Sequence, residues 1–267
     1  MNQKSYKELR FSDDFMFCKI MMENKDICKE VIELLIGCKV KDIVYLENQK
    51  TIDITSDGKG IRLDVYLEDG NTVYDIEMQT TLSKDLPKRA RYYQGMIDLN
   101  LINRGAAYSE LKKSYVVFIC LDDFAKKNRS IYTFRNCCIE DKNIELDDDS
   151  TKVFVNANGN REGLTEAQIA FLDYISGKEP SDSFTRRLNR EIQKALDKEE
   201  WEVEYMTLLQ RDKVKYEEGR VEGKVEGRTQ ELISLVRDGL LLPEIAAERL
   251  NITVDKFFEL MKEKENK

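Results

Sequence analysis

Two acidic residues and a glutamine form the most chemically suggestive group in the sequence. Residues 61–67 and 72–80 each alternate apolar and polar side chains, the pattern of two strands, and a turn-prone stretch separates them. Alternation puts Asp64 on the polar face of the first strand, and Glu77 and Gln79 on the polar face of the second. A hairpin of these strands would bring the three side chains together.

Paired carboxylates on a strand face suit a hard divalent cation. Mg²⁺ binds oxygen ligands and keeps several waters, so it needs only one or two carboxylates from a protein. A cation held there would lower the pKa of a bound water and neutralise charge on a scissile phosphate, which is the chemistry of phosphodiester hydrolysis. The same pattern is also typical of an ordinary hairpin whose acids face water, and on its own it favours that interpretation.

The composition narrows the chemistry that the chain can perform. No histidine occurs among the 267 residues, which excludes Ser-His and Cys-His nucleophiles and leaves carboxylates, lysine and bound metal. The six cysteines form no CxxC pair and lie in apolar segments, so we expect small buried hydrophobic residues rather than a zinc site. The formal net charge of -8 disfavours broad phosphate binding, so any nucleic-acid contact must rely on local basic clusters.

The hydrophobic fraction of 41% and charged fraction of 35% indicate a folded, highly charged globular protein. No apolar run approaches the roughly 20 residues that span a bilayer, and the first residues contain no apolar signal stretch. We therefore expect a cytoplasmic protein without a membrane partner.

Helices and a buried strand are expected around the acidic hairpin. Apolar residues at helical intervals predict one or two helices over residues 11–39, and residues 42–46 and 50–55 favour short strands before a turn at 56–58. Residues 114–121 form a nearly continuous apolar run, which is typical of a central strand covered on both faces.

A basic helix is expected directly after the second acidic strand. Pro87 suits the first turn of a helix that runs to about residue 103. Lys88, Arg89 and Arg91 lie in its first turns, close in sequence to the carboxylates, where they could bind the backbone of a nucleic acid. An exposed basic helix face is the simpler interpretation of any one of them.

Several short motifs follow one another along the chain. They are RLDV at 62–65, DIEMQ at 75–79, LPKR at 86–89 and RYYQ at 91–94, accompanied by FSDDFMF at 11–17, a strand at 115–120 and IYTF at 131–134. Each motif is weak alone, but the ordered set over about residues 5–230 resembles the Rpn family of recombination-promoting nucleases and transposases, within the PD-(D/E)XK nuclease superfamily.

The resemblance implies an α/β fold with a PD-(D/E)XK restriction-endonuclease-like core, a mixed sheet flanked by helices, and a helical C-terminal region. It implies that Asp64 and Glu77 hold Mg²⁺, with Mn²⁺ as a substitute, and that metal-activated water cuts DNA. Gln79 takes the position of the superfamily's lysine and can orient water or a phosphate oxygen without adding positive charge. Asp14, and with less support Glu33, could add a further acid from the opening helices.

The leading interpretation is a Mg²⁺-dependent DNA endonuclease associated with recombination or transposition. Retention of both Asp64 and Glu77 favours an enzyme. Gln79 and the acidic net charge favour an alternative, a noncatalytic or weakly active DNA-binding or assembly protein that keeps the nuclease fold. A nuclease directed at RNA, or one used as a toxin or in defence, would share the same chemistry.

We expect a nuclease-like core over residues 1–160, a helical extension over 161–230 and a small helical module over 231–267. The repeat EGRV-EGKV-EGRT aligns Gly219, Gly223 and Gly227 at four-residue spacing. It predicts a helix whose glycine stripe packs against a partner, and hence a homo-oligomer, although a flexible charged linker fits as well.

The last segment carries the spacing of a helix-turn-helix. Ala246 and Ala247 would let two helices approach closely, Asn251 would form the turn, and Thr253 would cap the next helix. Such a pair could read DNA or simply pack, and its several acidic residues leave the choice open.

Overall fold

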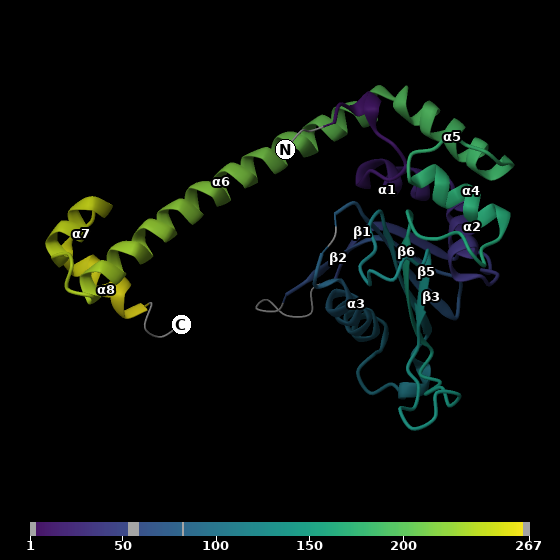
Figure 1. Cartoon of the computed structure of the whole chain (residues 1–267), viewed down its shortest axis with the longest axis horizontal. Helices are drawn as coiled ribbons and strands as arrows, with labels where there is room; N and C mark the ends of the chain where they lie inside the picture. Colours follow the sequence, from purple (N-terminus) through teal and green to yellow (C-terminus); the bar gives the residue numbers. More distant parts are fainter. Residues whose placement is uncertain (1–3, 53–58, 82, 264–267) are drawn as a thin grey trace. The chain divides into compact units, whose positions relative to one another are not determined.

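The computed structural model describes residues 4–52, 59–81 and 83–263, and the first of its two compact units contains a six-stranded sheet (Figure 1). The strand order is β1-β2-β3-β4-β6-β5, with parallel pairing of β3 with β4 and of β4 with β6, and antiparallel pairing elsewhere. The strands are β1 (Tyr45–Ile52), β2 (Ile61–Glu68), β3 (Thr72–Gln79), β4 (Lys113–Cys120), β5 (Ile131–Phe134) and β6 (Ser150–Asn156). The predicted mixed sheet is confirmed, and the turn predicted at 56–58 lies outside the described residues.

Helices cover both faces of this sheet, as expected for an α/β fold. The helical elements are, in chain order, η1 (Tyr6–Glu8), α1 (Asp14–Glu23), α2 (Lys25–Ile36), α3 (Leu86–Leu101), η2 (Tyr108–Glu110), α4 (Glu166–Ile175), α5 (Ser183–Leu196), α6 (Glu199–Arg237), α7 (Pro243–Leu250) and α8 (Val254–Glu263). On one face α3 buries Leu86, Ala90 and Ile97 against the sheet. On the other, α1 contacts β1, β2 and β3, and α2 contacts β6.

Strands β3 and β4 are the most buried part of the sheet, because helices cover both of their faces. In β3 every side chain from Val73 to Met78 is buried, including the charged Asp75 and Glu77. In β4 the run from Ser114 to Cys120 is buried as well, which explains its nearly continuous apolar sequence. The interpretation of the acidic hairpin as a solvated surface is therefore wrong.

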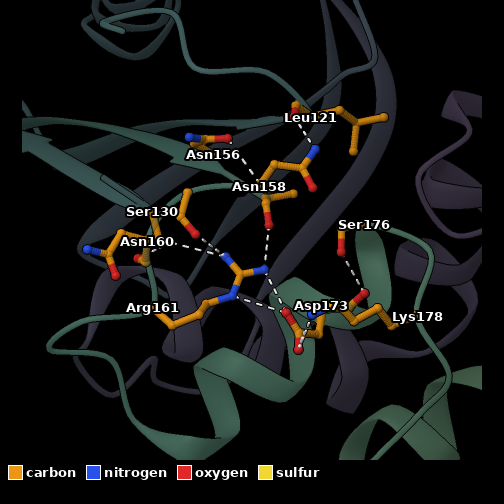
Figure 2. Close-up of polar contacts among 11 residues, drawn as sticks. Leu121, Ser130, Asn156, Asn158, Asn160, Arg161, Asp173, Ser176 and Lys178 are labelled. Atoms are coloured by element: carbon orange, nitrogen blue, oxygen red, sulfur yellow. Dashed lines mark hydrogen bonds and ion pairs between the residues drawn. The ribbon is translucent and has the colours of Figure 1, made fainter. Parts of the chain in front are cut away.

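The connection from β6 to α4 is fixed by the guanidinium group of Arg161 (Figure 2). Its Nη2 donates to the Ala157 carbonyl oxygen at 2.6 Å and to Asp173 Oδ1 of α4 at 2.7 Å. Gly159 lies so close to the neighbouring loop that an added Cβ would be 2.5 Å from the Arg129 carbonyl oxygen. This tight loop fixes the start of α4, whose Gln168 Nε2 donates to the Leu34 carbonyl oxygen of α2.

The chain divides into two compact units, Met1–Glu202 and Val203–Lys267. The first includes α4 and α5, so the segment predicted as a helical extension over residues 161–230 is shared between the two units. The second unit has its own small core, formed by Leu232, Ile233, Ala246, Ala247 and Phe257.

The glycine repeat and the C-terminal turn take the predicted backbone conformations. Residues 217–228 lie within α6, so the helical interpretation of the repeat is confirmed and the linker interpretation is wrong. Between α7 and α8, Asn251 adopts the left-handed conformation with φ 56°, and Thr253 Oγ1 accepts a hydrogen bond from the Lys256 backbone N–H.

The prediction that the cysteines are buried holds for only some of them. Cys18, Cys28 and Cys120 are buried as expected, but the prediction is wrong for Cys38 and Cys137, which are exposed, and for the half-buried Cys138, because these three lie in connecting segments. In the part of the chain that the structure describes, no helix is both long enough and apolar enough to cross a membrane.

Candidate active site

The acidic pair lies where two strands of the sheet separate. The ladder between β2 and β3 runs from Glu68 opposite Val73 to Val65 opposite Ile76, and the next pair would be Asp64 with Glu77. There the side chains take over the backbone hydrogen bonds: the Asp64 N–H donates to Glu77 Oε1 at 2.9 Å, and the Met78 N–H donates to Asp64 Oδ2 at 3.1 Å. Each carboxylate is thus oriented by the backbone of the partner strand.

Strand β1 is distorted at the same level. It pairs Asn48 with Val65 and Lys50 with Leu63, and Gln49 between them has a positive φ of 49°. Asp64 therefore lies at an irregular position on both edges of its strand. This local geometry lets Asp64 approach α1 as well as β3, since a carboxylate oxygen of Asp64, one of Asp14 and the Cys18 sulfur all lie within 4.8 Å of one another.

Arg89 is part of this acidic site. From α3 its Nη2 donates to Glu77 Oε2 at 2.7 Å and its Nη1 donates to Gln79 Oε1 at 2.6 Å. The guanidinium carbon lies 4.8 Å from the Phe118 ring centroid and 5.2 Å from that of Tyr93. Arg89, one of the three residues that the sequence predicted to bind nucleic acid, is therefore already engaged by contacts within the protein.

Lys88 and Arg91 differ from Arg89, because both are exposed on α3. Helical geometry explains the division: residues 88 and 91 lie three apart on one side of the helix, whereas residue 89 points from the buried face toward β3. Glu33, the weaker candidate acid, is engaged elsewhere, because its carboxylate accepts hydrogen bonds from the Val40 N–H and Lys39.

The acidic side chains near Arg89 have raised pKa values. Burial, then the charges of Glu77 and Asp14, raise the pKa of Asp64 to about 8. Burial also raises the pKa of Glu77, although the Asp64 N–H and Arg89 oppose that shift. A further cation beside these carboxylates would favour their ionised forms.

Asp75 is a member of this group that the motif analysis did not assign to the site. It is completely buried, and neither of its carboxylate oxygens has a hydrogen-bond partner among the described residues. Burial, with the charges of Glu77 and Asp64, raises its pKa well above the usual value. The signal was present in the sequence as the first acid of DIEMQ, because alternation places Asp75 on the same strand face as Glu77.

The donor set fits a hard divalent ion. Carboxylate oxygens of Asp14 from α1 and Asp64 from β2 lie close together, and Glu77 of β3 accepts a hydrogen bond from the Asp64 N–H beside them. Asp14 is exposed to solvent. Mg²⁺ prefers such oxygen ligands and completes its shell with water and substrate oxygens. The residues present therefore suit the ion that the sequence predicted.

A comparison with protein-family models matches residues 12–223 to the PD-(D/E)XK nuclease family transposases. The chain belongs to this family. The match covers the whole sheet, the acidic group and α3, and it confirms the resemblance drawn from the ordered motifs. Comparisons with curated proteins and with solved structures found no match.

Gln79 is the residue that the motif resemblance aligned with the superfamily's lysine, so a lysine at this position is an informative variant. A lysine would put an ammonium group beside the guanidinium of Arg89, which now donates to the Gln79 amide oxygen at 2.6 Å. Because like charges repel in a half-buried site, we expect Gln79→Lys to lower the cleavage rate about tenfold, or about 1.4 kcal/mol. Initial rates of Gln79→Lys and Gln79→Met would check this, and a rate above that of the unmodified protein would contradict it.

Proposed function

We propose that the chain is a Mg²⁺-dependent DNA endonuclease that hydrolyses phosphodiester bonds with a metal-activated water. The observation that supports this best is a group of buried or half-buried acids, Asp64, Asp75 and Glu77, of which Glu77 is paired with Arg89. The exposed Asp14 lies close to Asp64. Buried carboxylates without enough cations destabilise a fold, so their presence together favours a site completed by a ligand of positive charge. Membership of a nuclease family supports phosphodiester hydrolysis as the reaction class.

The side chains divide the work in this proposal. Asp64 and Glu77, with Asp14 beside them, hold the ion, whose contribution is to polarise the phosphate and to lower the pKa of a bound water. Arg89 and the Asp64 N–H keep Glu77 in one orientation. Gln79 orients the attacking water or a phosphate oxygen through its amide, and Arg89 supplies the fixed positive charge that glutamine lacks.

The direct test is cleavage of matched substrates. Supercoiled plasmid, single-stranded DNA and RNA of one sequence are incubated with the full chain in Mg²⁺, in Mn²⁺ and in EDTA. We expect metal-dependent nicking of the plasmid, with faster cleavage of duplex DNA than of RNA. Faster cleavage of RNA would mean that the substrate is RNA rather than DNA, with the same metal-dependent mechanism. Binding of DNA without cleavage in either metal would favour the noncatalytic alternative.

The exposed basic residues of α3 should bind the DNA backbone rather than take part in catalysis. Replacing both Lys88 and Arg91 with glutamine should weaken DNA binding and lower the salt-dependence slope by about two, one for each lost phosphate contact. Fluorescence anisotropy across a salt series measures both quantities. The matched control is the double replacement of exposed Lys127 and Lys142, and an equal effect in that control would contradict a local binding site.

We also propose that α6 mediates self-association of the chain. A Cβ added at Gly219, Gly223 or Gly227 would meet no described atom within 4 Å, so the stripe is not packed within the described chain. Replacing all three with alanine should stabilise the isolated helix by about 1 kcal/mol per site but weaken association that depends on close helix contact. Sedimentation over a concentration series checks this, and unchanged association, or a monomer before replacement, would contradict the proposal.

A further inference from the structure

A thiol lies among the carboxylates of the candidate active site. Cys18 and Asp14 are four residues apart on α1, one turn of the helix, so their side chains lie on the same side. The Cys18 sulfur and carboxylate oxygens of Asp14 and Asp64 lie within 4.8 Å of one another. Three ligand atoms of two chemical kinds therefore surround one point beside β2.

The thiol and the carboxylates prefer different metals. Mg²⁺ takes oxygen ligands and does not displace a thiol proton, whereas Cd²⁺, Zn²⁺ and Co²⁺ bind sulfur strongly. Cys18 is buried, with 2% of its surface exposed, and its Sγ lies 3.6 Å from the Asp64 carbonyl oxygen, to which the thiol donates. A protonated Cys18 thus does not bind Mg²⁺, but its sulfur can bind a softer ion.

We propose that the site has a second binding mode, in which Asp14, Cys18 and Asp64 together hold a thiophilic divalent cation in place of Mg²⁺. The inference rests on the proposed function, because Asp64 serves both modes. Binding forms one metal–sulfur bond and breaks the S–H bond, and the proton leaves to solvent without any change of oxidation state. Since Asp64 cannot serve both ions in full, a bound soft ion opposes the Mg²⁺ form.

The position of the site in the fold supports this second mode. Asp14 is exposed while Cys18, one helical turn further along α1, is buried, so Asp14 is the ligand of this group that faces solvent. Glu77 is held beside Asp64 on the β3 side by Arg89 and the Asp64 N–H. The soft mode therefore uses the α1 side of Asp64, and the Mg²⁺ mode uses the β3 side as well.

Cadmium titration tests the proposal, with sulfur-to-metal charge-transfer absorption in the near ultraviolet as the readout. The full chain carries serine at Cys38, Cys137 and Cys138, which removes the thiols that are exposed or half-buried. We expect a charge-transfer band that persists in excess Mg²⁺ and that Cys18→Ala abolishes. Loss of a hydrogen-bond partner behind a ligand costs about 10- to 100-fold in metal affinity, so loss of the sulfur should weaken Cd²⁺ binding at least as much.

Three further variants separate the possible outcomes. Asp14→Asn should weaken Cd²⁺ binding, whereas Cys28→Ala, which removes a buried thiol of α2, should leave it unchanged. Glu77→Gln should weaken Mg²⁺ binding but keep the Cd²⁺ band. If the protein with Glu77 intact shows the Cd²⁺ band but no Mg²⁺-dependent cleavage, the proposed function is refuted and the second binding mode stands. Absence of a band, or a band that survives Cys18→Ala, would overturn the second binding mode.

Discussion

Asp64→Asn should abolish metal-dependent cleavage and at the same time raise the melting temperature of the metal-free protein. The amide keeps the side-chain oxygen that accepts from the Met78 N–H, but unlike the carboxyl group it cannot ionise beside Glu77 and Asp14. Loss of a charged group that acts at the transition state costs about a hundredfold to a thousandfold in rate. Relief of repulsion between buried acids acts in the opposite direction on stability.

The same residue gives the stability of the protein a defined pH dependence. The pKa of Asp64 is about 8 in the folded chain, against an ordinary value of 3.8 for an aspartate in an unfolded chain, so the folded state binds the proton more tightly between these limits. The free energy of unfolding should therefore fall as the pH rises from about 4 to about 8. Mg²⁺ should reverse much of that loss, because it favours the ionised carboxylates.

Thermal unfolding with and without Mg²⁺ measures these effects, at about 2–4 °C for each kcal/mol in a chain of this size. Asp98→Asn is the matched control, because Asp98 is a half-buried acid of α3 that lies outside the acidic group and bonds to Gln94. It should leave cleavage unchanged. An Asp64→Asn variant that still cuts DNA, or that melts at a lower temperature, would refute the role assigned to Asp64.

Arg89→Met should cost the protein both stability and activity. The side chain of Arg89 is 32% exposed, while that of its partner Glu77 is 2% exposed, so the variant leaves a buried carboxylate without its counter-ion. Removing one partner of a buried ion pair costs about 3–5 kcal/mol, and the partial exposure of Arg89 favours the lower end. We expect the cleavage rate to fall about a hundredfold or more, because Glu77 loses its fixed orientation.

A series at position 89 distinguishes this role from DNA binding. Arg89→Lys keeps the charge but cannot reach Glu77 and Gln79 with two parallel donors, so it should keep most of the stability and lose most of the activity. Chemical denaturation and initial cleavage rates at saturating DNA measure the two effects. If Arg89→Met changed only the affinity for DNA, as expected for Arg91→Gln, Arg89 would belong to the binding surface.

Much of the sheet could be predicted from local patterns in the sequence. The alternation of residues 61–67 and 72–80 fixes a hairpin, and the hairpin register alone places Asp64 opposite Glu77. The apolar run around Val117 predicts a central strand because both of its faces are covered. Such signals depend on near neighbours in the chain, which is why single elements were recovered.

The remaining features of the site depend on contacts between distant segments. Residues 88, 89 and 91 look equivalent in the sequence, and only the packing of α3 on β3 separates the half-buried Arg89 from the other two. Cys18 resembles any other apolar-segment cysteine until α1 lies beside β2. Burial of Asp75 is likewise a property of the assembled sheet, because strand alternation cannot tell a covered polar face from a solvated one.

The gap in the ladder at Asp64 also bears on how the fold opens. Backbone pairing between β2 and β3 stops there, and the N–H groups of Asp64 and Met78 depend on carboxylates for their hydrogen bonds. Rotation of either acidic side chain removes these hydrogen bonds and therefore loosens the sheet at its interior rather than at an edge. The hairpin can therefore open locally at Asp64, and the hydrogen bonds that orient the acids for turnover are the same ones that resist this local unfolding.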